Sequence, residues 1–108
     1  MGEDSASGWH IETATVNDRP AVSFRRPWED TRTTLRTTDP DRVTADLRAL
    51  EEIDRTHPSW YVGFLIRTTP VSHLDGLWAQ YPGVTVVHAE TPPDLIRRIT
   101  DARARHGL

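Results

Sequence analysis

The pattern of apolar and polar residues predicts a β-hairpin near the start of the chain. Residues 9–16 (WHIETATV) alternate in the way typical of a strand with one buried face, and residues 21–24 resume an extended pattern. Between them, Asn17-Asp18-Arg19 has the composition of a turn. The threonine-rich residues 31–37 then favour a third strand at a sheet edge.

Two helices are predicted from their first residues and their apolar spacing. Asp39-Pro40 starts one, because aspartate caps free N–H groups and proline suits the first turn, and Pro58 ends it. Thr91-Pro92-Pro93 starts another, which continues towards Arg105. The residues at helical spacing are Val43, Leu47, Leu50 and Ile53 in the first, and Leu95, Ile96, Ile99 and Ala102 in the second.

A third helix is predicted over residues 72–81. Ser72 to Asp75 has the spacing of a capping box, and Pro82-Gly83 follows as a stop signal. The apolar residues that take positions i, i+3, i+4 and i+7 are Leu74, Leu77, Trp78 and Tyr81. Trp78 is therefore expected in the core, together with Trp60.

Two short runs are apolar throughout and predict strands buried on both faces. They are residues 60–66 (WYVGFLI) and residues 84–87 (VTVV). A strand–helix–strand–helix order favours parallel neighbours joined by a right-handed crossover. We therefore expect an α/β fold, with α+β as the alternative: a mixed sheet of four or five strands, an N-terminal hairpin and three helices, in the order β-β-(β)-α-β-α-β-α.

Length and composition restrict the possible classes of protein. The 108 residues suit one domain, expected over residues 9–108, after a small, acidic tail at residues 1–8 predicted to be disordered. Cysteine is absent, which excludes disulfides and thiolate catalysis. All 13 basic residues are arginine, so Schiff-base chemistry is excluded too. The net charge of −3, without a strongly basic segment, does not favour nucleic-acid binding. No apolar run suggests a membrane span or a signal peptide, so we expect a cytoplasmic protein.

Polar residues follow the two apolar runs and suggest a ligand site. If those strands are parallel, their carboxyl ends meet at one sheet edge, where open α/β sheets bind ligands. Helix N-termini and an arginine at that edge would favour a small anion. The candidate ligand-binding residues are Arg67, Thr68, Ser72, His73, His88, Glu90 and Thr91. The alternative is that Ser72 and Thr91 only cap helices and that Arg67 is a solvated strand end.

Two histidine–carboxylate pairs have the spacing found in metal sites, but they are short signals. They are His73-x-Asp75 and His88-x-Glu90. The second resembles half of a zinc-deaminase motif, but the two cysteine ligands that such a site requires do not exist in this chain. No metal, cofactor or catalytic residue is assigned. A small enzyme with a histidine base and an orienting carboxylate is the weakest of three hypotheses.

The segment Arg25-Arg26-Pro27-Trp28-Glu29-Asp30 places a tryptophan among charges, without a periodic apolar stripe to bury it. Arginine and tryptophan are enriched at the hot spots of protein interfaces. Trp28 could equally fold back over a sheet edge. The candidate partner-binding residues are Arg25, Arg26, Trp28, Glu29 and Asp30.

These observations favour a non-catalytic binding or regulatory module that acts on another protein. An immunity or antitoxin-like role, or a subunit of a larger complex, falls within this class, and a homodimer stays open. The second hypothesis is a domain that binds a small molecule or an anion through the strand-end residues.

Overall fold

The computed structural model describes residues 8–68 and 72–108, and its first three strands form an antiparallel sheet. In the order β1-β2-β3, these strands are β1 (His10–Val16), β2 (Arg19–Arg25) and β3 (Thr33–Arg36). Asn17 and Asp18 join the first two with φ values of 52° and 64°. Two positive φ values are typical of a type I′ hairpin turn, which asparagine and aspartate tolerate. The predicted hairpin and third strand are confirmed; the expected tail lies outside the described residues, apart from Gly8.

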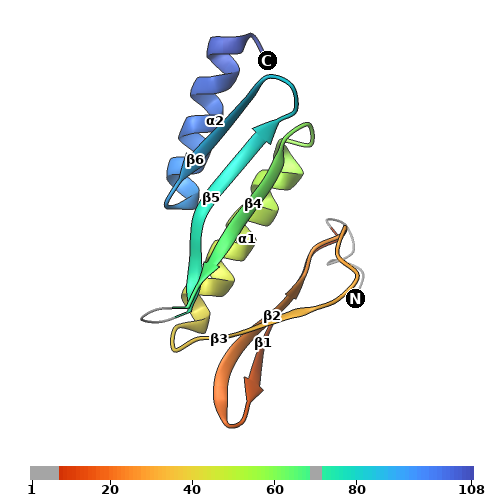
Figure 1. Cartoon of the computed structure of the whole chain (residues 1–108), viewed down its shortest axis with the longest axis vertical. Coiled ribbons are helices and arrows are strands. Elements are labelled where there is room, and N and C mark those ends of the chain that lie inside the picture. Colours follow the sequence, from red (N-terminus) through yellow and green to blue (C-terminus); the bar gives the residue numbers. More distant parts are fainter. Residues whose placement is uncertain (1–7, 69–71) are drawn as a thin grey trace.

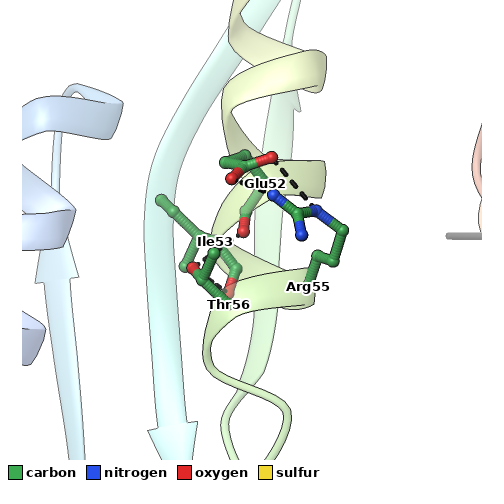
Figure 2. Close-up of polar contacts among 4 residues, drawn as sticks. All are labelled: Glu52, Ile53, Arg55 and Thr56. Atoms are coloured by element: carbon green, nitrogen blue, oxygen red, sulfur yellow. Dashed lines mark hydrogen bonds and ion pairs between the residues drawn. The ribbon is translucent and has the colours of Figure 1, made fainter.

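Helix α1 (Pro40–Thr56) begins and ends where the sequence predicts. The Asp39 carboxylate accepts a hydrogen bond from the Arg42 N–H (3.2 Å). At the other end, shown in Figure 2, the Thr56 hydroxyl donates to the Glu52 carbonyl oxygen (2.8 Å), and Arg55 pairs with the Glu52 carboxylate. The Asp39 contact satisfies a backbone N–H that the helix start leaves without an intrahelical partner. The predicted stripe is the buried one: Val43, Leu47, Leu50 and Ile53.

The rest of the chain forms a second antiparallel sheet and one more helix. The strands, in the order β4-β5-β6, are β4 (Tyr61–Arg67), β5 (His73–Tyr81) and β6 (Thr85–Ala89), followed by α2 (Pro92–His106). The chain is therefore a small single α+β domain with two three-stranded sheets and two helices among the described residues. The predicted single mixed sheet, third helix and parallel crossover are wrong.

The segment predicted as the third helix is β5, and a β-bulge explains the error. Gly63 pairs with Trp78 but Leu65 pairs with Asp75, so β5 contains one extra residue at this point. Gly76 lies there with a φ of 56°, the left-handed conformation found in glycine bulges. The extra residue brings Leu74 and Leu77 to the same buried face although they are three positions apart. Buried apolar residues three positions apart otherwise indicate a helix.

Helix α1 supplies the core shared by both sheets. It packs against β1 and β2 of the first sheet and against β4 and β5 of the second. Both helices cover the same face of the second sheet (Figure 1). The other face of this sheet is open as far as the described residues show, and it carries Tyr61, Leu65 and Val86 as exposed side chains. Residues 60–66 were thus wrongly expected in the middle of a sheet, because β4 is an edge strand. Neither helix in the described part of the chain is both long and apolar enough to cross a membrane.

Replacing Gly76 by alanine should change the free energy of unfolding in opposite directions in a bulged strand and in a helix. Gly76→Ala is expected to lower the free energy of unfolding by about 1–2 kcal/mol, because alanine is strained at positive φ. In a helix the same change would stabilise the protein by about 1 kcal/mol. Urea unfolding measures the difference.

Gly76→Asn is the matched control, because asparagine tolerates the left-handed conformation better than alanine does. We expect the asparagine variant to be the more stable of the two. An alanine variant more stable than the wild-type protein would contradict the bulge.

Candidate functional site

The predicted partner-binding segment forms a tight turn whose tip carries Trp28. The Glu29 N–H donates to the Arg26 carbonyl oxygen (3.0 Å), with Pro27 and Trp28 between them. Proline is favoured at the second position of such a turn. The Glu29 carboxylate accepts from the Arg26 backbone N–H (2.7 Å) and from its guanidinium (2.6 Å). The Arg25 guanidinium donates to the Glu29 carbonyl oxygen (3.1 Å). The turn is therefore fixed by its own residues, and Asp30 lies exposed just after it.

The Trp28 side chain is exposed but held in place. Its exposed fraction is 57%. The edge of its ring meets Trp9, with 6.0 Å between ring centroids and an interplanar angle of 89°. Trp9 is buried, and its indole N–H donates to the Asp54 carboxylate of α1 (3.0 Å). This chain of contacts ties the turn to the core helix. Trp28 is thus largely exposed, although its ring also packs against Trp9 and Arg26.

The Arg26 guanidinium joins the turn to β4. Its central carbon lies 5.5 Å from the Trp28 ring centroid and 4.7 Å from that of Phe64, distances typical of cation–π contacts. Phe64 in turn packs against Phe24 of β2, with 5.8 Å between centroids. The buried Arg26 Nε finds no acceptor among the described residues.

A cavity of about 480 Å³ lies between the turn and the edge of β4. We call it the aromatic groove. The turn forms one wall of the groove. The other wall belongs to the open face of the second sheet, where Trp78 lies opposite Gly63. A Cβ at Gly63 would overlap the Trp78 ring, so the glycine allows the indole to lie flat against the strand. Tyr61, 61% exposed, stands at the rim. The principal lining residues are Arg26, Trp28, Asp54, Tyr61, Phe64 and Trp78.

The predicted ligand-binding residues do not form one site. Strands β4 and β6 do run in the same direction, because each is antiparallel to β5, but β5 lies between them. The crevice expected between parallel neighbours is therefore absent from the described fold. Thr68 and Ser72 line a cavity with residues of the first sheet. His73 begins β5 opposite Arg67, and Ser72 caps no helix.

Four of these residues line a shallow depression at the strand ends: Arg67, His88, Glu90 and Thr91. Its two arginines, Arg67 and Arg98, are already paired. Arg67 donates to Asp75 (2.6 Å), and this hydrogen bond lowers the pKa of the Asp75 carboxyl group. Arg98 lies 3.3 Å from the Asp94 carboxylate, which also pairs with Arg97.

The N-terminus of α2 offers the depression few donors. Pro92 and Pro93 have no N–H, and the Asp94 N–H donates to the Thr91 hydroxyl (3.3 Å). The next N–H, that of Leu95, donates to the Thr91 carbonyl oxygen (3.0 Å). Thr91 is thus the predicted helix cap, and the arrangement does not favour an anion.

The histidine–carboxylate pairs are not assembled into a metal centre. Among residues 8–68 and 72–108, no group of three or more histidine and carboxylate side chains is placed to hold a metal ion. Asp75 is engaged by Arg67, while His88 and Glu90 are exposed at the end of β6 and in the loop after it.

Sequence reasoning found one wall of the aromatic groove and missed the other. Phe64 and Tyr61 were assigned to a strand buried on both faces, and Trp78 to a buried helix face. Trp78 is instead half-buried on the open face of the second sheet. Gly63, between aromatic residues in a strand, was the available signal, because a glycine inside a strand marks a close approach of other atoms.

No protein-family model matches this chain, and searches of curated proteins and of solved structures give no significant match.

Glu29 gives the turn a testable dependence on pH. Hydrogen bonding from Arg26 lowers the pKa of the Glu29 carboxyl group from its ordinary value of 4.5, against the opposing effect of burial. The ion pair therefore stabilises the folded state above the unfolded-state pKa, and this contribution is lost as the pH falls through the lower folded-state pKa. Glu29→Gln is expected to lower the free energy of unfolding at about pH 6 and to have little effect at about pH 2.

Urea unfolding at both pH values measures this difference. Glu90→Gln, at an exposed glutamate outside the turn, is the control and should show no comparable change between them. If Glu29→Gln lowered the free energy of unfolding as much at the acidic pH as at the higher one, the carboxylate charge would not be what stabilises the turn.

Proposed function

We propose that this chain is a non-catalytic binding module that recognises another protein through the Arg25–Asp30 turn and the aromatic groove. The observation that carries the proposal is the exposed Trp28 side chain on a turn fixed by internal hydrogen bonds. A fixed aromatic side chain loses little conformational entropy on binding, so more of its contact energy appears as affinity.

The groove beside Trp28 supports this proposal. Aromatic side chains bury large areas, and arginine and tryptophan are enriched at interface hot spots. Arg26 is paired with Glu29 and Asp54 accepts from Trp9, so the charged groups of the groove already have partners within the chain. A partner's apolar or aromatic side chain suits such a lining better than an ion does. An immunity or antitoxin-like protein, or a subunit of a complex, would use a surface of this kind.

The two other hypotheses have less support. The two arginines of the strand-end depression are already paired and the helix start beside it is proline-rich, and neither feature favours an anion. A small enzyme would need a histidine oriented by a carboxylate, and the Asp75 carboxylate of the first candidate pair is engaged by Arg67.

Photo-cross-linking in the source cell tests the proposal. A benzophenone side chain at position 61, on the rim of the groove, is compared with the same group at position 105, an exposed site near the end of α2. We expect position 61 to capture a defined partner and position 105 to capture none. A product of twice the chain mass would identify that partner as a second copy of the chain.

Trp28→Ala should weaken the captured interaction by about 30-fold or more, the effect of a hot spot of at least about 2 kcal/mol. Val84→Ala, at another exposed apolar residue in the turn between β5 and β6, should change it little. Equal affinity of the Trp28→Ala and wild-type proteins, or equal capture at positions 61 and 105, would contradict the proposal.

A further inference from the structure

A second cavity, of about 350 Å³, lies at the opposite end of the first sheet from the aromatic groove. Arg19 begins β2 and Arg36 ends β3, whereas the Trp28 turn follows the other end of β2. The residues between β3 and α1 and on either side of the β4–β5 connection complete the lining. We call it the arginine cavity; its polar lining residues are Arg19, Arg36, Thr37, Thr38, Thr68 and Ser72.

The two arginines bring like charges together. Arg36 pairs with Ala21, and Arg19 lies two residues before Ala21, so both side chains belong to one face of the sheet. Diagonal neighbours of this kind are about 7–8 Å apart, within reach of long side chains. The described lining contains no carboxylate. Neither arginine makes an ion pair or hydrogen bond with the described residues, in contrast to Arg26, Arg32 and Arg67.

Thr37 supplies a hydroxyl group whose proton is free to donate. The residue is 5% exposed, and its hydroxyl oxygen accepts a hydrogen bond from the Asp39 N–H (3.0 Å). Its backbone N–H is bound to the Pro20 carbonyl oxygen (3.2 Å). A hydroxyl that accepts in this way still has one proton to donate. The neighbouring carboxylate, Asp39, is engaged as the cap of α1 and is not part of the lining.

We propose that the arginine cavity binds a small phosphate-type oxyanion, either free or as part of a phosphate ester. Guanidinium groups donate to such oxygens in pairs, and these charge-assisted bonds are about twice as strong as neutral ones. Four hydroxyl side chains in the lining are further possible donors. The cavity is larger than one such ion requires, so an ester of a small molecule has room. This site is independent of the proposed protein interface.

Titration of the full ¹⁵N-labelled chain with inorganic phosphate, at constant ionic strength set with chloride, tests the site. We expect NMR shift changes at Thr37, Thr38 and the Nε groups of Arg19 and Arg36. Arg36→Gln should weaken binding at least about tenfold, equivalent to about 1.4 kcal/mol. Arg105→Gln, an exposed arginine near the end of α2, is the matched control and should bind as the wild type does. Equal affinity of both variants, or shifts scattered over all arginines, would overturn the proposal.

The stability of the variants separates a ligand-binding role from a structural one. Without phosphate, Arg19→Gln and Arg36→Gln should melt at the same temperature as the wild type or higher, because each removes one of two positive charges on the same face of the sheet and breaks no ion pair with the described residues. With phosphate, only the wild type and the Arg105→Gln control should gain stability, because a ligand stabilises the folded state that binds it. A loss of stability in phosphate-free buffer would show that the arginines are structural and would count against the site.

The source of the oxyanion is distinguished by two further probes. A nucleoside monophosphate and a sugar phosphate represent soluble esters, and vesicles with phosphatidylinositol phosphate in phosphatidylcholine represent a lipid headgroup. Tighter binding of either class than of inorganic phosphate, lost in Arg36→Gln, supports the site and names its source. Vesicle binding that survives Arg36→Gln would argue against it.

Discussion

The packing of α1 against both sheets is the interaction on which the rest of the structure depends. A sheet with one apolar face has to bury that face against another element. Here one stripe of α1 covers β1 and β2 as well as β4 and β5, so both sheets draw on the same core. The buried residues of this stripe are Val43, Leu47, Leu50 and Ile53.

This arrangement also creates the two candidate surfaces. Since the sheets share a helix but no strand pairing, β4 remains an edge strand and faces the Trp28 turn across the aromatic groove. At the other end of the first sheet, the chain crosses from β3 into α1, and the arginine cavity lies there, lined also by Thr68 and Ser72. Each surface thus combines the first sheet with the second, and neither would exist in one continuous sheet.

The local signals were reliable where a single residue type has a strong conformational preference. Asp39 and Thr91 cap helices, and the Asn17-Asp18 turn takes the positive φ values that these residues tolerate. The wrong predictions came from apolar spacing. Such spacing indicates which residues are buried, but not whether they lie on a helix, an edge strand or a central strand. The bulge at Gly76 gave β5 the spacing of a helix, and the apolar run of β4 suggested a central strand although Tyr61 and Leu65 are exposed.

The sequence by itself determined the two helices of the described residues, with their caps, and five of the six strands found there, and it predicted an interface at the Arg25–Asp30 segment. Short-range hydrogen bonds and backbone preferences decide such features, and they are local to a few residues. Only the tertiary structure decided that β5 is a strand, that Tyr61 and Trp78 form the second wall beside Trp28, and that Arg19 and Arg36 share a cavity with Thr68 and Ser72. These juxtapositions depend on strand register and on how α1 holds two sheets together, and neither is encoded in the spacing of neighbouring residues.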